Sequence, residues 1–93
     1  MRERDIEQKF AKAVKATGGI APKFVSSGFD GMPDRIVLLQ GGRVAFVEVK
    51  AKGKKPTALQ LQRHGMLRRL GFRVFVLDDA EQIGGLIREI QST

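Results

Sequence analysis

The chain has 93 residues, a formal net charge of +7 and no cysteine. This length allows one small domain over residues 1–93 with a modest core, and the lack of cysteine excludes disulfides and thiolate-bound zinc. No apolar run approaches the roughly 20 residues of a membrane span, and the charged first residues are unlike a signal peptide, so we expect a soluble cytoplasmic protein.

Apolar residues at helical spacing predict a helix over 2–17, ended by Gly18-Gly19. Apolar runs then predict strands over 20–25, 34–40 and 43–50, the last two joined as a hairpin by Gly41-Gly42. A helix over 57–70, a strand over 72–77 and a helix over 80–91 follow, which gives the order αβββαβα. A helical crossover makes the strands that it joins parallel, so the sequence predicts a mixed α/β sheet flanked by helices. The core-facing residues expected on the helix over 57–70 are Leu59, Met66, Leu67 and Leu70.

Two carboxylates and a lysine are expected at one end of the predicted hairpin. Asp34 opens its first strand after Pro33, whereas Glu48 and Lys50 end its second strand, at a similar distance from the turn. The second strand is apolar on both faces, so its carboxylate loses water, at a cost of several kcal/mol unless it is paired or binds a metal. An ordinary ion pair at a frayed strand end is the alternative.

Three short motifs carry a resemblance to a known family: Gly31-x-Pro33-Asp34, Glu48-x-Lys50 and Thr57-x-x-Gln60. Together they resemble the PD-(D/E)XK nuclease signature, in the form found in stand-alone VRR-NUC domains of phages and bacteria. The resemblance runs from Glu3 to about Leu77. It implies a restriction-endonuclease-like core and DNA cleavage with Mg²⁺ or Mn²⁺ as cofactor. It implies the catalytic residues Asp34, Glu48, Lys50 and Gln60, and the metal ligands Asp34, Glu48, the Val49 carbonyl and Glu3.

Three further residues have competing explanations. Gln60 can form a capping box with Thr57 at a helix start, and the resemblance also places it near the active site. Glu3 is favoured near a helix N-terminus by the helix dipole, and Glu7 is its rival as a metal ligand. His64, the only histidine, lies one turn from Gln60, and we interpret it as a surface or boundary residue.

The excess of positive charge favours a polyanionic partner, although a solvated basic loop would also account for it. All six aromatic residues are phenylalanines in apolar contexts, so contacts to the DNA backbone are expected rather than base stacking. The candidate phosphate contacts are Lys23, Arg43, Lys52, Lys54, Lys55 and Arg68.

These observations and the resemblance together predict a metal-dependent DNA endonuclease, and the resemblance implies that it is structure-selective. Stand-alone relatives of the similar family act as dimers on branched DNA, and four-way junctions have matching two-fold symmetry. The resemblance therefore implies a homodimer that cuts Holliday junctions, with the first helix or an apolar helix face at the interface. A nuclease for flaps, nicks or forks is the close alternative, and a non-catalytic basic module that binds nucleic acid is the third.

Overall fold

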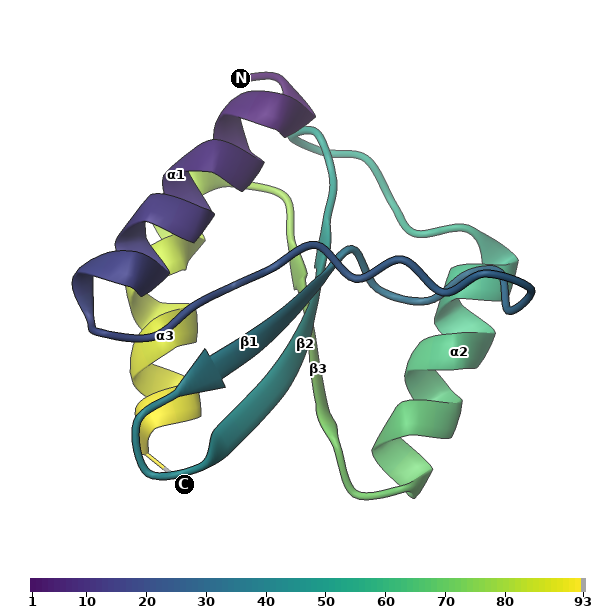
Figure 1. Cartoon of the computed structure of the whole chain (residues 1–93). Coiled ribbons are helices and arrows are strands. Elements are labelled where there is room, and N and C mark those ends of the chain that lie inside the picture. The colour runs from purple at the N-terminus through teal and green to yellow at the C-terminus, as the bar shows by residue number, and fades with distance from the viewer. Residues whose placement is uncertain (93) are drawn as a thin grey trace.

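A three-stranded sheet separates two helical layers in the computed structural model, which describes residues 1–92 (Figure 1). The strands β1 (Arg35–Leu39), β2 (Arg43–Val49) and β3 (Arg73–Leu77) lie side by side in that order. β1 and β2 are antiparallel, and the hairpin turn between them uses positive φ angles at Gly41 and Gly42. β2 and β3 are parallel, so the predicted mixed sheet is confirmed.

The helices cover the two faces of the sheet unequally. α1 (Glu3–Ala16) and α3 (Ile83–Gln91) lie on one face, α2 (Ala58–Arg69) lies on the other, and a short 3-10 turn, η1 (Ala80–Gln82), precedes α3 (Figure 1). The strand residues alternate between these layers. The larger core holds residues of α1 and α3 together with Val37, Leu39, Ala45, Val47, Val49 and Leu77, whereas the smaller core under α2 holds Phe46, Leu67 and Val74.

The segment predicted as a strand over 20–25 runs along the edge of β1 but forms only two isolated antiparallel bridges, Ile20 with Leu38 and Lys23 with Arg35. Between them the carbonyl of Pro22 accepts a hydrogen bond from the N–H of Ile36. Proline has no N–H to return that bond, so the ladder is interrupted there. The predicted first strand is therefore an irregular edge segment.

The face of α2 that meets the sheet differs from the prediction. Leu67 is buried, but the side chains of Leu59 and Leu70 are 38% and 66% exposed. His64, in contrast, is fully buried, so its interpretation as a surface or boundary residue is wrong. The last helix lies within the predicted range 80–91, and its apolar residues Ile83, Leu86, Ile87 and Ile90 are all buried. Among residues 1–92, no helix is both long enough and apolar enough to cross a membrane.

Candidate active site

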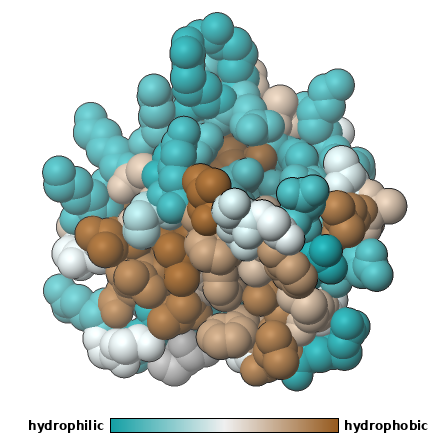
Figure 2. Space-filling view, turned by 45° about the vertical axis from the view of Figure 1, so that its right-hand side comes forward, coloured by the Kyte–Doolittle hydropathy of each residue, from teal (hydrophilic) through white to brown (hydrophobic). Residues whose placement is uncertain are grey.

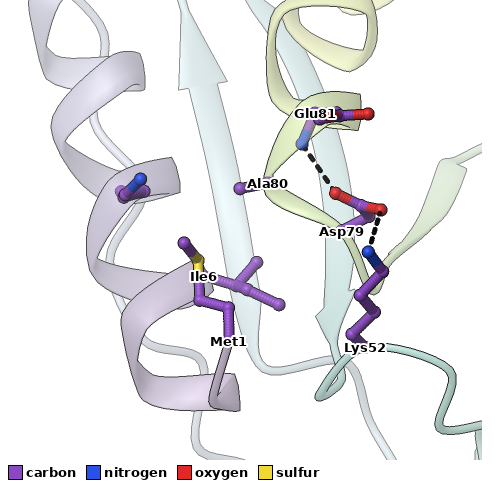
Figure 3. Close-up of a pocket in the computed structure, with 7 residues that line it drawn as sticks. Met1, Ile6, Lys52, Asp79, Ala80 and Glu81 are labelled. Atoms are coloured by element: carbon purple, nitrogen blue, oxygen red, sulfur yellow. Dashed lines mark hydrogen bonds and ion pairs between the residues drawn. The ribbon is translucent and has the colours of Figure 1, made fainter.

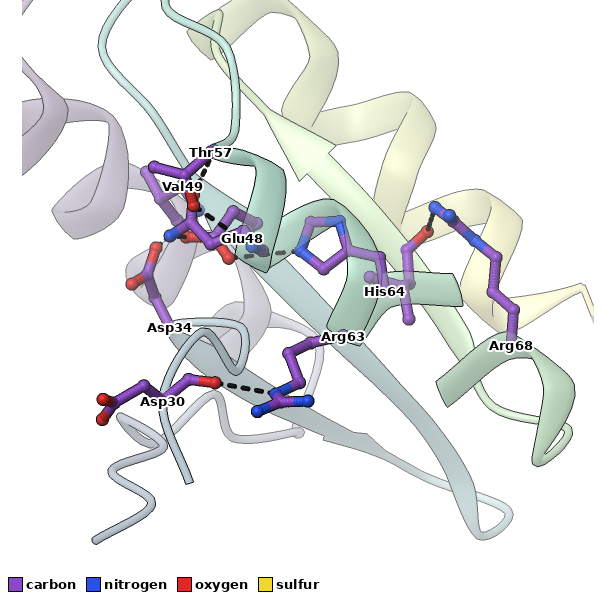
Figure 4. Close-up of polar contacts among 10 residues, drawn as sticks. Asp30, Asp34, Glu48, Val49, Thr57, Arg63, His64 and Arg68 are labelled. Carbon is purple, nitrogen blue, oxygen red and sulfur yellow. Dashed lines mark hydrogen bonds and ion pairs between the residues drawn. The ribbon is translucent and has the colours of Figure 1, made fainter. Parts of the chain in front are cut away.

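The hairpin brings Asp34 and Glu48 to the same end of the sheet. Arg35 pairs with Val47 in the antiparallel register, so the next residues outward, Asp34 and Glu48, face each other just beyond the paired positions. The Asp34 carboxylate is held in place because its Oδ2 accepts the backbone N–H of Val49 at 2.8 Å (Figure 4). The carboxylate pair predicted from the spacing about the turn is therefore present.

Glu48 lies between the sheet and α2, and only 1% of it is exposed. Gln60 Nε2 donates a hydrogen bond to its Oε2 at 2.9 Å, and His64 Nε2 lies 3.2 Å from its Oε1 (Figure 4). Residues four apart on a helix share one face, so a single helix supplies both contacts. Both carboxylate oxygens of Glu48 are thereby held from α2.

The environment of Glu48 favours its protonated form. Burial is the largest effect that raises its pKa, to about 8, followed by a hydrogen bond to the Asp34 carboxyl and repulsion from it. The negative charge of Glu3 acts in the same direction, whereas the positive charge of Lys50 lowers the pKa. When both carboxyl groups are ionised, the site therefore has too little positive charge nearby, and a divalent cation would supply it.

The donor set fits a hard cation. Mg²⁺ and Mn²⁺ prefer carboxylate and carbonyl oxygens, which Asp34, Glu48 and the neighbouring Val49 backbone offer. Among residues 1–92, no three His, Cys, Asp or Glu side chains converge closely enough to form a cage by themselves. Backbone oxygen, water or substrate phosphate would therefore have to complete the coordination, as is usual for Mg²⁺.

His64 is uncharged near neutral pH. Its pKa is lowered first by burial and then by the positive charge of Arg68 one turn further along α2. The contact with Glu48 is therefore a hydrogen bond rather than an ion pair. Within the described part of the chain, the other ring nitrogen, Nδ1, is buried without a hydrogen-bond partner. Sequence reasoning left His64 out, although its spacing of four from Gln60 placed it on the same side of the helix.

Gln60 has both of the geometries that the sequence suggested. Its side-chain Oε1 accepts a hydrogen bond from the backbone N–H of Thr57 at 2.9 Å. Its backbone N–H donates a hydrogen bond to Thr57 Oγ1 at 3.1 Å, so the capping box is complete. The amide nitrogen of the same side chain contacts Glu48. One residue therefore fixes the start of α2 and holds a carboxylate of the site.

The two glutamates of α1 differ in their surroundings. Glu7 forms an ion pair with Arg35 at 2.9 Å, and Arg35 also donates to the carbonyl of Ala21 at 2.7 Å, which ties α1 to the edge of the sheet. Glu3 is exposed at the first residue of α1, and its charge acts on Glu48. Glu3 is therefore the better placed of the two to reach the site.

The predicted phosphate contacts are not all at this end of the sheet. Lys52, Lys54 and Lys55 are exposed on the loop after β2, where Lys52 lies 3.7 Å from Asp79. Arg43 begins β2 at the hairpin turn, five residues from Glu48 and so roughly 17 Å away. Lys23 is exposed beside the start of β1, and Arg68 donates to the carbonyl of Val74 at 2.9 Å. Contact of each with DNA stays a prediction.

The loop before Asp34 depends on Gly31. Its φ is +87°, and a Cβ there would lie 2.8 Å from Leu59 Cγ, so glycine lets the loop pack against α2. From α2, Arg63 donates to the carbonyl of Asp30 at 2.8 Å (Figure 4). Its guanidinium also lies over the Phe29 ring. The motif Gly31-x-Pro33-Asp34 thus positions the carboxylate through a close loop–helix contact.

A cavity of about 300 Å³ lies elsewhere, between the start of α1 and η1 (Figure 3). The Asp79 carboxylate beside it is already engaged by the Glu81 N–H and by Lys52. The cavity therefore has no carboxylate arrangement like that at Asp34 and Glu48. Its lining residues are Met1, Ile6, Lys9, Lys52, Asp79, Ala80 and Glu81.

Comparison with known proteins agrees with this geometry. A solved structure described as "VRR_NUC domain" superposes with a TM-score of 0.86 at 33% sequence identity, over 92% of this chain and 94% of that chain. A phage protein named "Putative nuclease p44", from Acyrthosiphon pisum secondary endosymbiont phage 1, is 49% identical over 81 residues, which are 87% of each chain. The chain belongs to the VRR-NUC family. No family model matches the chain, so this assignment rests on the individual relatives.

Proposed function

We propose that this VRR-NUC protein is a metal-dependent DNA endonuclease. The observation that carries the proposal is the Glu48 carboxylate, which is buried beside Asp34 and Lys50 with its pKa raised to about 8. Burying a carboxylate in this way is costly, so it does not stabilise the fold better than an apolar residue would. It gives a nuclease two adjacent oxygen ligands for a cation.

Each residue of the site has a distinct role in this proposal. Asp34, Glu48 and the Val49 carbonyl would hold Mg²⁺ or Mn²⁺, with Glu3 of α1 as a further ligand. When bound, the ion would act as a Lewis acid that lowers the pKa of a water and offsets charge on the phosphate. Lys50 orients the attacking water and holds the scissile phosphate. Gln60 keeps the Glu48 carboxylate in position from α2.

A non-catalytic binding module explains these features less well. The exposed lysines of the loop after β2 would attract a phosphate backbone in either case. Asp34 and Glu48, however, repel phosphate unless a cation lies between them and the substrate. The binding module therefore accounts for the net charge of +7 but not for the carboxylates.

The preferred substrate in this proposal is a four-way DNA junction, cut by a homodimer. One chain carries one carboxylate site, so paired cuts on two strands need two chains related by a two-fold axis. Exposed leucines in α2 and at its C-cap offer apolar contacts, since the side chains of Leu61 and Leu70 are 55% and 66% exposed. Apolar side chains also gather over the lower part of the face in Figure 2, away from the hydrophilic upper part. Flaps, nicks and forks are the alternative substrates.

Incubation with supercoiled plasmid tests the reaction. We expect nicking with Mg²⁺ or Mn²⁺ and none with EDTA, and no nicking by Asp34→Asn under either condition. Retardation of the plasmid in a gel without metal-dependent cutting would support the binding module instead.

A second experiment tests the substrate and the assembly. Light scattering measures the oligomeric state, and matched junction, flap, fork and linear duplexes are compared for cleavage rate. We expect a dimer that prefers the junction. A strict monomer that cuts linear duplex as fast as a junction would reject the junction proposal and leave the phosphodiesterase.

A further inference from the structure

His64 is a buried polar group that the proposed reaction does not use. Its side chain is 1% exposed, and its Nε2 faces Glu48 Oε1 at 3.2 Å while its Nδ1 has no partner among residues 1–92 (Figure 4). Burying an unpaired ring nitrogen is unfavourable, and an apolar side chain of similar size would avoid that cost. The contact of Nε2 with Glu48 is therefore the feature that explains a histidine at this buried position.

We propose that His64 is a positioning residue for the metal site: its Nε2–H holds Glu48 Oε1 while Gln60 holds Oε2, which fixes the carboxylate for a divalent cation. This inference rests on the proposed metal-dependent function. The two donors come from one helix, and each occupies a different carboxylate oxygen. With both oxygens held, the carboxylate plane cannot rotate freely. Each oxygen keeps a second lone pair, so a cation can still bind.

The uncharged state of His64 suits this role. Burial and the nearby Arg68 both disfavour the imidazolium. A neutral ring donates one hydrogen bond without adding a positive charge that would compete with the cation for Glu48. Partners of this kind, outside the ligands themselves, contribute to metal affinity by keeping ligands oriented.

Calorimetric titration of the full chain with Mn²⁺ tests the proposal. His64→Leu keeps the volume but removes the donor, and we expect Mn²⁺ to bind about 10- to 100-fold more weakly. His64→Gln keeps an amide donor at a similar reach, and we expect it to restore most of the affinity. Leu67→Ala is the matched control, because it loosens the same buried face of α2 without touching Glu48. It should lower the melting temperature and leave Mn²⁺ affinity unchanged.

The outcomes separate the two proposals. If the unmodified protein binds no Mn²⁺, the proposed function fails. If it binds Mn²⁺ and His64→Leu binds equally well, only the role of His64 is rejected. The same rejection follows if Leu67→Ala weakens binding as much as His64→Leu, because general loosening would then explain the loss.

A measurement on the unmodified protein covers the case in which His64→Leu does not fold. His64 is the only histidine, so its ring nitrogens give the only imidazole signals in a ¹H–¹⁵N spectrum. In the Mg²⁺-saturated protein we expect a protonated Nε2 and a bare Nδ1, with an Nε2 shift that changes during the Mg²⁺ titration. A bare Nε2 at saturation, or ring signals that do not respond to Mg²⁺, would overturn the proposal.

Discussion

Glu48 and His64 meet at 3.2 Å in the interior between the sheet and α2, where each side chain is 1% exposed. Both groups are uncharged near neutral pH in the absence of metal, because burial raises the pKa of the carboxyl to about 8 and lowers the pKa of the imidazole below its ordinary value. The pair is therefore a neutral hydrogen-bonded contact that leaves room for a cation's charge. This state makes the stability of the metal-free protein sensitive to pH.

Stability without metal should fall as pH rises from 6.5 to 8. The folded protein keeps the Glu48 proton up to about pH 8, whereas the unfolded chain releases it near 4.5, so the folded state binds more protons across this window. His64 acts in the opposite direction, but only below about its ordinary value of 6.5, because its folded pKa is lowered. We expect a loss of about 2 kcal/mol in the free energy of unfolding, measured with denaturant in EDTA.

Glu48→Gln is the control for this pH dependence. The amide keeps the shape of the side chain and cannot titrate, so its stability should be flat between pH 6.5 and 8 and exceed that of the unmodified protein at pH 8. A slope that persists in Glu48→Gln would assign the effect to another group.

Asp34→Asn and Lys50→Ala should separate metal binding from cleavage. Asp34→Asn keeps an oxygen acceptor for the Val49 N–H, so the local structure should persist. Because it removes the charge of a metal ligand, both Mn²⁺ affinity and the cleavage rate should fall by at least about 100-fold. Lys50→Ala leaves the carboxylates intact, so Mn²⁺ should still bind while cleavage is lost. Calorimetry and plasmid nicking measure the two effects, and full cleavage by Lys50→Ala would remove this lysine from the mechanism.

Gln60→Ala and Thr57→Ala should divide the two roles of Gln60. Each breaks the capping box at the start of α2 and should cost about 1 kcal/mol of stability in thermal or denaturant unfolding. Only Gln60→Ala also removes the hydrogen bond to Glu48, so only this variant should cut more slowly, by about 10- to 100-fold. Equal loss of cleavage in the two variants would reduce the role of Gln60 to capping.

DNA binding should weaken steeply with salt. About five phosphate contacts correspond to a slope of log K against log salt of about −4 to −5. Lys54→Ala, on the exposed loop after β2, should reduce this slope by about 1. Fluorescence anisotropy between 50 and 200 mM salt, a range over which such contacts have large effects, measures both, and a flat response would reject backbone binding.

Local pattern was sufficient for most of the framework. The glycine pair at 41–42 and the apolar runs on either side of it predicted the hairpin, and the similar distances of Asp34 and Glu48 from that turn predicted their approach. Both inferences depend only on the two-residue period of a strand and on antiparallel pairing, which residues close in sequence decide. The VRR-NUC resemblance was carried by the same short motifs and is confirmed by the relatives.

The side chains that meet across layers needed the tertiary structure. The sequence assigned Leu59 and Leu70 to the core and left His64 at the surface, because hydrophobicity ranks leucine as buried and histidine as exposed. In the fold the histidine is buried and the two leucines are exposed. The reason is that α2 covers the end of β2, where the buried Glu48 carboxylate needs hydrogen-bond donors rather than methyl groups. The sequence by itself determined the carboxylate pair and the order of the elements, apart from the irregular edge segment predicted as the first strand. Only packing across layers decided which residues of α2 hold Glu48, because burial depends on the partner surface rather than on the residue alone.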